Sequence, residues 1–158
     1  MSTGSPTVYK KIIAAVDGSP ASIRAASQAA HIAKMAGAEL LIIHAVQEIK
    51  QGGVIGLRAR YGDVTLVDAF RKVMKEDAEK MLAPIVKSAT DSGTKVKSEI
   101  IVDEDESEAG AIIKYAEKHG ADLIVVGSKG KSRFERILLG GVASKIVSAA
   151  KCQVLIMR

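Results

Sequence analysis

The chain has 158 residues, of which 47% are hydrophobic, 26% charged and 3% aromatic, so its composition is that of a soluble globular protein with an aliphatic core. The net charge of +5 comes from lysines and arginines that are spread along the chain without interleaved aromatic side chains, which argues against nucleic acid as a partner. No apolar stretch is as long as a membrane span, the N-terminus has no apolar signal region, and the single Cys152 excludes an intramolecular disulfide, which together predict a cytoplasmic protein with no membrane partner.

The N-terminal third predicts two buried strands joined by a helix. Residues 1–9 are expected to be a flexible N-terminus, and the apolar run Lys11–Val16 predicts the first strand. Ser19-Pro20 is a helix-start signal, with serine as the N-cap and proline in the first helical position, and Gly37 is the expected stop. The apolar run Glu39–Val46 predicts the second strand.

The middle of the chain predicts a loop and a long helix. Residues 47–63 contain four glycines and no periodic pattern, so we expect a mobile loop, which is long for a compact domain. Apolar residues then recur at helical spacing from Leu66 to Ile85, and Ser92-Gly93 ends the helix. Pro84 lies inside this helix and is predicted to kink or split it, because proline lacks the backbone N–H and clashes with the preceding turn.

A third strand and a third helix follow. The partly alternating segment Lys95–Val102 predicts the strand. Asp105 and Glu108 have the spacing of a capping box, in which Asp105 would cap the start of the helix. The helix is expected to run to His119, with Gly120 as its stop.

Three more elements complete the chain: a strand at Asp122–Val126, a helix at Val142–Ala150 and a strand at Gln153–Met157. Apolar strands that alternate with amphipathic helices predict one α/β domain over residues 1–158, with a parallel sheet covered by helices on both faces. Ligands of such sheets bind beyond the carboxyl ends of the strands, where the strand order reverses. The residues leave the order itself open, because the first strand could lie beside the fourth or, as in flavodoxin-like sheets, beside the third.

A glycine segment follows the predicted strand at Asp122–Val126. Its spacing is Gly127-x2-Gly130-x9-Gly140, and four basic side chains lie within it. Glycines let a backbone approach a ligand closely, and the N–H groups at a helix start attract anions. The segment therefore predicts a phosphate site. A Walker A loop is excluded, because Val125 stands where its first glycine is needed, and the dinucleotide fingerprint is absent after the first strand. The four basic residues are Lys129, Lys131, Arg133 and Arg136.

Each of these features has a plainer interpretation. The three glycines could serve only a turn and a helix entry, and Asp17 could simply cap its own turn. The acidic run Asp103–Glu106 could bind magnesium, although acids at a helix start are favourable in their own right. His44 is expected to be a satisfied core or dimer-side residue. The histidines and Cys152 show no metal-ligand spacing, and no motif supports a nucleophilic catalytic set.

From Lys10 onward the sequence resembles the universal stress protein family, in particular its nucleotide-binding branch. The resemblance rests on a strand followed by Asp17-Gly18-Ser19 and on the long spaced motif Gly127-x2-Gly130-x9-Gly140. Further matches are Ala121–Ser128, the Ile137–Gly140 stretch and the closing strand at Cys152–Ile156. The long motif is quite specific, whereas the Asp-Gly-Ser turn alone would be weak.

The resemblance implies a three-layer, doubly wound, five-stranded parallel sheet of strand order 3-2-1-4-5, Rossmann-like and of the adenine nucleotide alpha hydrolase type. It also implies a homodimer through the last strand, Gln153–Met157, and ATP, ADP or AMP, with or without Mg²⁺, at the switch point. By position, Asp17 would hold the adenine end, Ala45 or Val46 would line the base pocket, and the glycines would lie near ribose and phosphates. The implied site consists of Ala15, Val16, Asp17, Ala45, Val46, Gly127, Ser128, Lys129, Gly130, Lys131, Arg133, Gly140, Gly141, Val142 and Ala143.

Two departures from the family pattern bear on function. Gly141 stands where the family usually has serine or threonine, so the backbone N–H survives but a hydroxyl for the phosphate or metal is lost, unless Ser132 or Ser144 compensates. The acidic run Asp103–Glu106 stands where relatives tend to have a glycine. The leading hypothesis is a dimeric, ATP-binding sensor or switch of the stress response. The alternatives are a slow ATP hydrolase and a nucleotide-free dimeric interaction module.

Overall fold

The computed structural model describes residues 9–47, 61–62, 64–103, 106–129 and 139–158. The expected flexible N-terminus and the expected loop at 47–63 lie almost wholly outside these residues, as do three of the implied site residues, Gly130, Lys131 and Arg133. The described elements are β1 (Lys11–Ala15), α1 (Pro20–Ala36), β2 (Glu39–Gln47), α3 (Val64–Asp91), β3 (Val96–Asp103), α4 (Glu108–His119), β4 (Leu123–Gly127), α5 (Gly141–Ala149) and β5 (Gln153–Met157).

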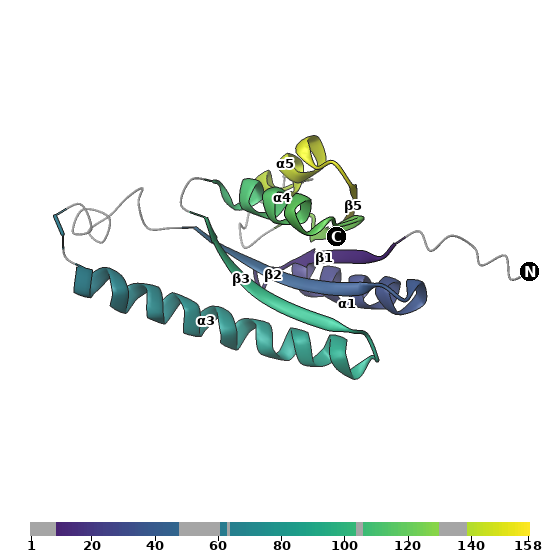
Figure 1. The fold of residues 1–158 in the computed structure, drawn as a ribbon, viewed down its shortest axis with the longest axis horizontal. Helices are drawn as coiled ribbons and strands as arrows, with labels where there is room; N and C mark the ends of the chain where they lie inside the picture. Colours follow the sequence, from purple (N-terminus) through teal and green to yellow (C-terminus); the bar gives the residue numbers. More distant parts are fainter. Residues whose placement is uncertain (1–8, 48–60, 63, 104–105, 130–138) are drawn as a thin grey trace, which may run out of the picture.

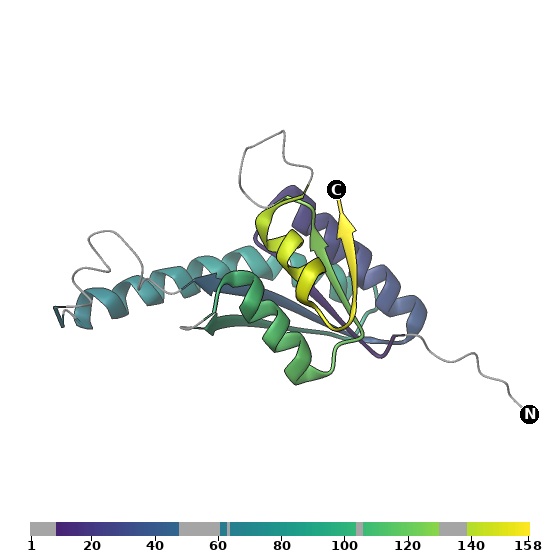
Figure 2. The same ribbon diagram turned by 90° about the horizontal axis from the view of Figure 1, so that it is seen from above.

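The five strands form one parallel sheet of order β3-β2-β1-β4-β5. Helices α1 and α3 lie on one face of the sheet, and α4 and α5 lie on the other (Figures 1 and 2). The predicted doubly wound architecture and the strand order implied by the family resemblance are both confirmed. The alternative that the residues left open is resolved, because β1 pairs with β4 through Ala15 and Val126, whereas β3 lies beyond β2.

The core consists of two aliphatic layers, one on each face of the sheet. Successive residues of a strand point to opposite faces. Ile12 of β1 therefore packs with α1 and α3, whereas Ile13 packs with α4 and α5. Both side chains are fully buried. The buried face of α1 consists of alanines and Ser22, and these small side chains let the helix lie close to the sheet.

The start of α1 and the ends of α1 and α4 follow the sequence signals, whereas the start of α4 does not. Ser19 caps α1 by accepting a hydrogen bond from the Ser22 N–H at 3.2 Å. Gly37 and Gly120 end α1 and α4 with φ values of 66° and 64°, as predicted. The capping box that placed Asp105 at the start of α4 is wrong. Ser107 stands directly before the first helical residue, and its hydroxyl caps the helix instead.

Helix α3 runs without a break from Val64 to Asp91, so the predicted split at Pro84 is wrong. Pro84 and Lys80 both lie on the exposed side of the helix, where water can bind the Lys80 carbonyl oxygen that loses its helical donor. The N-terminal half of α3 extends past the end of the sheet (Figure 1), and the buried residues of the helix begin only at Ala78. None of the described helices combines the length and apolar character needed to cross a membrane.

Candidate functional site

A cleft of about 510 Å³ opens beyond the carboxyl ends of β1, β2 and β4. It lies where the strand order reverses on either side of β1, which is the ligand position expected for an open parallel sheet. Every implied site residue that the structure describes lines this one cleft. Those residues are Ala15, Val16, Asp17, Ala45, Val46, Gly127, Ser128, Lys129, Gly140, Gly141, Val142 and Ala143.

The turn after β1 brings Asp17 to the cleft. The Oδ1 atom of Asp17 accepts a hydrogen bond from the Ser19 N–H at 2.9 Å, and the Asp17 N–H lies 3.3 Å from the Ser22 hydroxyl oxygen. The carboxylate therefore orders the turn into α1, as the plainer interpretation proposed. This structural role does not compete with a ligand, because the half-buried side chain also lines the cleft.

The turn after β4 is held by backbone hydrogen bonds. The Ser128 N–H donates to the Met157 carbonyl oxygen, and the Gly140 N–H donates to the Ser128 carbonyl oxygen, each at 2.6 Å. Gly127 has a packing reason to be glycine. A Cβ atom there would lie 2.9 Å from the Ala21 carbonyl carbon and the Ser22 nitrogen, at the start of α1. The first glycine of the motif is thus required by the fit between β4 and α1.

The start of α5 forms the wall of the cleft beside this turn. Gly140 is the N-cap, and among the described residues no side chain caps the helix, whereas α1 and α4 are each capped by a serine hydroxyl. The first N–H groups of a helix have no acceptor within it, and they carry partial positive charge. Gly141, Val142 and Ala143 supply these groups, and Lys129 lines the same cleft. This end of the cleft attracts anions.

Several cleft residues were missed by the sequence reasoning, notably His44, Met74, Glu108 and Ile112. Nδ1 of His44 lies 2.7 Å from the Val16 carbonyl oxygen. Since a carbonyl only accepts, Nδ1 must carry the proton. The predicted satisfied histidine is therefore confirmed, but it also lines the cleft. The sequence held a hint only for His44, because it directly precedes the implied site residue Ala45. Met74 and Glu108 reach the cleft through the packing of α3 and α4, which the sequence does not show.

The acids after β3 have structural partners. The Asp103 carboxylate accepts hydrogen bonds from the Glu106 N–H at 3.1 Å and from the Lys114 ammonium at 2.9 Å. The Asp103 carboxylate thus fixes the backbone just before α4 and also binds a side chain of that helix. Within the part of the chain that the structure describes, no group of three or more histidine, cysteine, aspartate or glutamate side chains could hold a metal ion.

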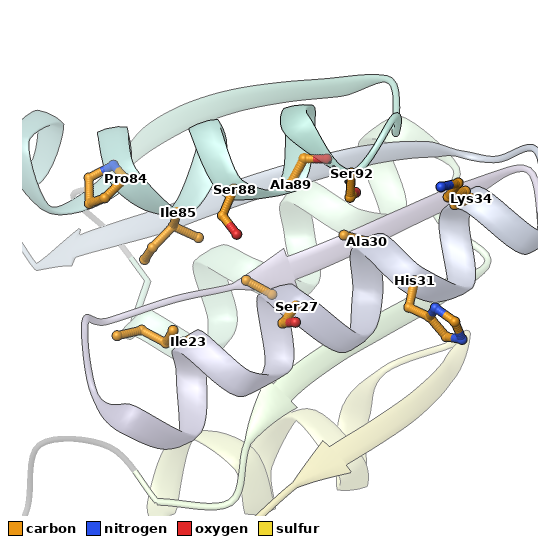
Figure 3. A pocket seen from close by; sticks show the side chains of 11 residues that line it. Ile23, Ser27, Ala30, His31, Lys34, Pro84, Ile85, Ser88, Ala89 and Ser92 are labelled. Atoms are coloured by element: carbon orange, nitrogen blue, oxygen red, sulfur yellow. Dashed lines mark hydrogen bonds between the residues drawn. The ribbon is translucent and has the colours of Figure 1, made fainter.

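A second hollow of about 420 Å³ lies between α1 and α3 (Figure 3). Its floor is formed by apolar and serine side chains, and His31 and Lys34 stand at one end (Figure 3). The Ser92 hydroxyl at its rim already donates to the Ala89 carbonyl oxygen at 2.6 Å. None of the implied site residues lines this groove, so the cleft at the strand ends is the candidate site.

The sequence matches the family model of the universal stress protein family over residues 8–158. The chain belongs to the universal stress protein family. It is 36% identical over 151 residues to the universal stress protein MJ0531 of Methanocaldococcus jannaschii. The aligned region covers 96% of this chain and 83% of that protein.

Solved structures agree with the family assignment. The structure of MJ0577 from the same organism matches with a TM-score of 0.78 at 27% identity, covering 95% of this chain and 96% of that chain. A universal stress protein solved in complex with cAMP matches with a TM-score of 0.64 at 25% identity, covering 95% and 97% of the two chains. Some members of the family therefore bind nucleotides.

Gly141 is one of the two positions at which this chain departs from the expected family pattern. It is the first residue of α5, and a Cβ atom built on it meets nothing within 4 Å. The glycine is therefore not required by packing among the described residues. A serine would fit at this position, so the effect of Gly141 is chemical, namely the absence of a hydroxyl, and not steric.

Proposed function

We propose that this universal stress protein binds an adenine nucleotide, with ATP as the leading candidate, in the cleft beyond β1, β2 and β4. The observation that carries the proposal is the start of α5, which lacks a side-chain cap among the described residues and opens onto the same cleft as the Asp17 turn and the end of β2. One elongated ligand with an anionic end matches this arrangement.

The phosphate end of the ligand fits the start of α5. Gly141, Val142 and Ala143, whose N–H groups begin α5, line the cleft together with Lys129. A helix start carries a partial charge of about +0.5, which stabilises a bound anion. Gly141 leaves open space for phosphate oxygens. The missing hydroxyl removes one hydrogen bond to a charged group, which costs roughly 1.5–3 kcal/mol, or about tenfold or more in affinity.

The remainder of the nucleotide fits the other end of the cleft. Ala45 and Val46 at the end of β2 and Ile112 of α4 give apolar walls for a base. Asp17 lies in the turn after β1, between the ends of β2 and β4, and its carboxylate would accept hydrogen bonds from ribose hydroxyl groups. Nucleotide sites commonly combine an apolar base pocket with a few polar groups that fix orientation.

A homodimer through β5 completes the proposal. β5 forms one edge of the described sheet, and Val154 to Met157 are only partly buried in the single chain. Edge strands with exposed backbone groups and apolar side chains favour pairing with another strand. Because Ser128 of the cleft donates to Met157 of β5, a nucleotide at this turn would bias the dimer interface. The proposed role is a nucleotide-dependent switch in the stress response.

Calorimetric titration with ATP, with and without Mg²⁺, tests the nucleotide proposal on protein stripped of co-purified nucleotide. We expect saturable binding by the wild type, no binding by Gly141→Asp and tighter binding by Gly141→Ser. Aspartate at a helix start stabilises the helix while its charge opposes a phosphate, so Gly141→Asp removes binding without unfolding the protein. Absence of binding to the wild type at millimolar ATP would refute the proposal and leave the dimeric interaction module. Chromatography of the bound nucleotide afterwards would reveal hydrolysis.

A further inference from the structure

β3 forms the edge of the described sheet opposite β5. Among the described residues it pairs with β2 alone, and α3 and α4 lie on its two faces (Figure 1). With eight residues, β3 is longer than β5, which has five. An edge strand of this length presents a row of backbone N–H and C=O groups to a further strand. This edge is therefore a surface that another chain can extend.

The hydrogen bonds to β2 identify the residues of β3 whose backbone groups point outward. The Leu40 N–H of β2 accepts no other role than donor, and it donates to the Lys95 carbonyl oxygen at 3.0 Å. Alternate residues of a parallel strand turn their backbone groups toward the same neighbour, so the odd-numbered residues of β3 face β2. The even-numbered residues Val96, Ser98 and Ile100 present their N–H and C=O groups outward.

A second copy of β3 fits this edge in an antiparallel arrangement centred on Ser98. Val96 then lies opposite Ile100 of the second copy, and these outward-facing residues form the hydrogen-bonded pairs of the ladder. Lys97 lies opposite Glu99 of the second copy, at a position without ladder hydrogen bonds, where opposed Cα atoms are only about 4.5 Å apart. Two-fold symmetry produces this ion pair twice.

The charges favour this register over its neighbours. A centre on Lys97 or on Glu99 would place two like charges directly opposite each other, which destabilises a sheet, whereas a centre on Ser98 places opposite charges there. Charged side chains usually protect an edge strand from pairing. That protection does not act against a second copy, because the antiparallel copy presents the same two charges in the reverse order.

Both charged side chains keep their contacts within the chain in this arrangement. The Lys97 ammonium lies 2.7 Å from Oε1 of Glu39, and Oε2 of Glu99 accepts from the Tyr115 hydroxyl at 2.5 Å. An ammonium has three N–H groups and a carboxylate has two oxygens, so each side chain can pair with a second group. Lys97 and Glu99 lie on the same face of β3, because alternate residues of a strand share a face.

We infer that β3 is a self-complementary interaction surface, through which two copies of this chain join their sheets with Ser98 on the two-fold axis and Lys97 paired with Glu99 of the second copy. This surface lies at the opposite edge of the sheet from the proposed β5 interface, and it requires no nucleotide. Association through β3 therefore links dimers formed through β5 into larger assemblies.

Disulfide crosslinking of the full chain tests the register. Cys152→Ser removes the one natural cysteine, and Ser98→Cys then places two thiols across the axis at a Cα separation of about 5.5 Å, which a disulfide spans. Val102→Cys is the matched control, because Val102 is 58% exposed on the same strand but its two copies would lie roughly 27 Å apart. Each rate of covalent dimer formation is divided by the rate at which the same thiol reacts with a small disulfide. We expect this ratio to be about tenfold higher or more for Ser98→Cys, and equal ratios would overturn the inference.

Charge reversals test the pairing of Lys97 with Glu99. In the Ser98→Cys, Cys152→Ser parent, Lys97→Glu and Glu99→Lys each set like charges opposite one another, so neither variant should crosslink to itself. A mixture of the two variants restores opposite charges at both positions and should form the mixed disulfide at the rate of the parent. Lys87→Glu changes the net charge equally at an exposed site on α3 and should crosslink like the parent. A variant that had merely lost its structure would not recover on mixing, so a mixture that crosslinks no faster than its components would contradict the pairing.

Discussion

The backbone N–H of Ser128 donates a hydrogen bond of 2.6 Å to the carbonyl oxygen of Met157. Ser128 is a buried wall residue of the cleft, and Met157 is the last residue of the edge strand β5. A displacement of the turn after β4 by a ligand must therefore act on the end of β5. This contact joins the candidate site directly to the strand of the proposed dimer interface.

We expect ATP to change the dimer dissociation constant measured by sedimentation equilibrium. Any such change requires different nucleotide affinities of monomer and dimer, because the coupling between the two equilibria is reciprocal. Gly141→Asp, which blocks the nucleotide, should leave a dimer whose dissociation constant does not respond to ATP. Identical wild-type constants with and without saturating ATP would contradict the coupling through Ser128 and Met157.

Replacing Gly127 by alanine should destabilise the fold. The added methyl group would lie 2.9 Å from backbone atoms at the start of α1, and forced overpacking typically costs about 1–3 kcal/mol in the free energy of unfolding. Gly141→Ala is the matched control, because its methyl group enters open space and alanine is a better helix former than glycine. Urea denaturation should show a lower free energy of unfolding for Gly127→Ala and no decrease for Gly141→Ala.

Shortening Met74 should weaken nucleotide binding without unfolding the protein. Met74 is 37% exposed and lines the cleft, whereas its neighbour Val73 is 52% exposed and does not. Loss of apolar cover from Met74→Ala should cost roughly 1–2 kcal/mol, about five- to thirtyfold in the ATP dissociation constant. Val73→Ala should leave that constant unchanged. Equal effects of the two variants would show that Met74 has no special contact with the ligand.

The ion pair between Glu39 and Lys97 should make stability depend on acid pH. The Lys97 ammonium, 2.7 Å from Oε1 of Glu39, holds the pKa of that carboxyl below its ordinary value, and partial burial opposes this only in part. A lowered folded-state pKa stabilises the protein above the unfolded-state pKa, and the stabilisation is lost as pH falls through the folded-state pKa.

Lys97→Met removes the largest cause of this dependence, although the charges of Lys11 and Lys95 still lower the pKa of Glu39. The free energy of unfolding of the wild type should exceed that of the variant by a constant amount at neutral pH, and the difference should shrink below about pH 4. Because the Lys97 side chain is 66% exposed, added salt should also reduce the difference. A gap between the two proteins that stays constant down to pH 3 would exclude Glu39 as its source.

Local signals in the sequence were enough for the elements and for most of their ends. Ser19, Pro20 and Gly37 each act through backbone geometry within a few residues, so their roles in α1 could be stated from the sequence. The apolar runs of β1, β2 and β4 likewise need only burial on both faces of a parallel sheet. Pro84 was misjudged because its effect depends on which side of α3 faces solvent, a property of packing.

Local sequence and tertiary packing each determine part of the candidate site. By itself, the sequence determined that Asp17 and the glycine segment follow buried strands, since strand and turn chemistry are local. That β1 lies beside β4, which brings these turns together, depends on how distant segments pack. The arrival of Met74 from α3 and of Glu108 from α4 at the same cleft was likewise decided only by the tertiary structure, because no local pattern encodes which parts of two helices meet over a sheet.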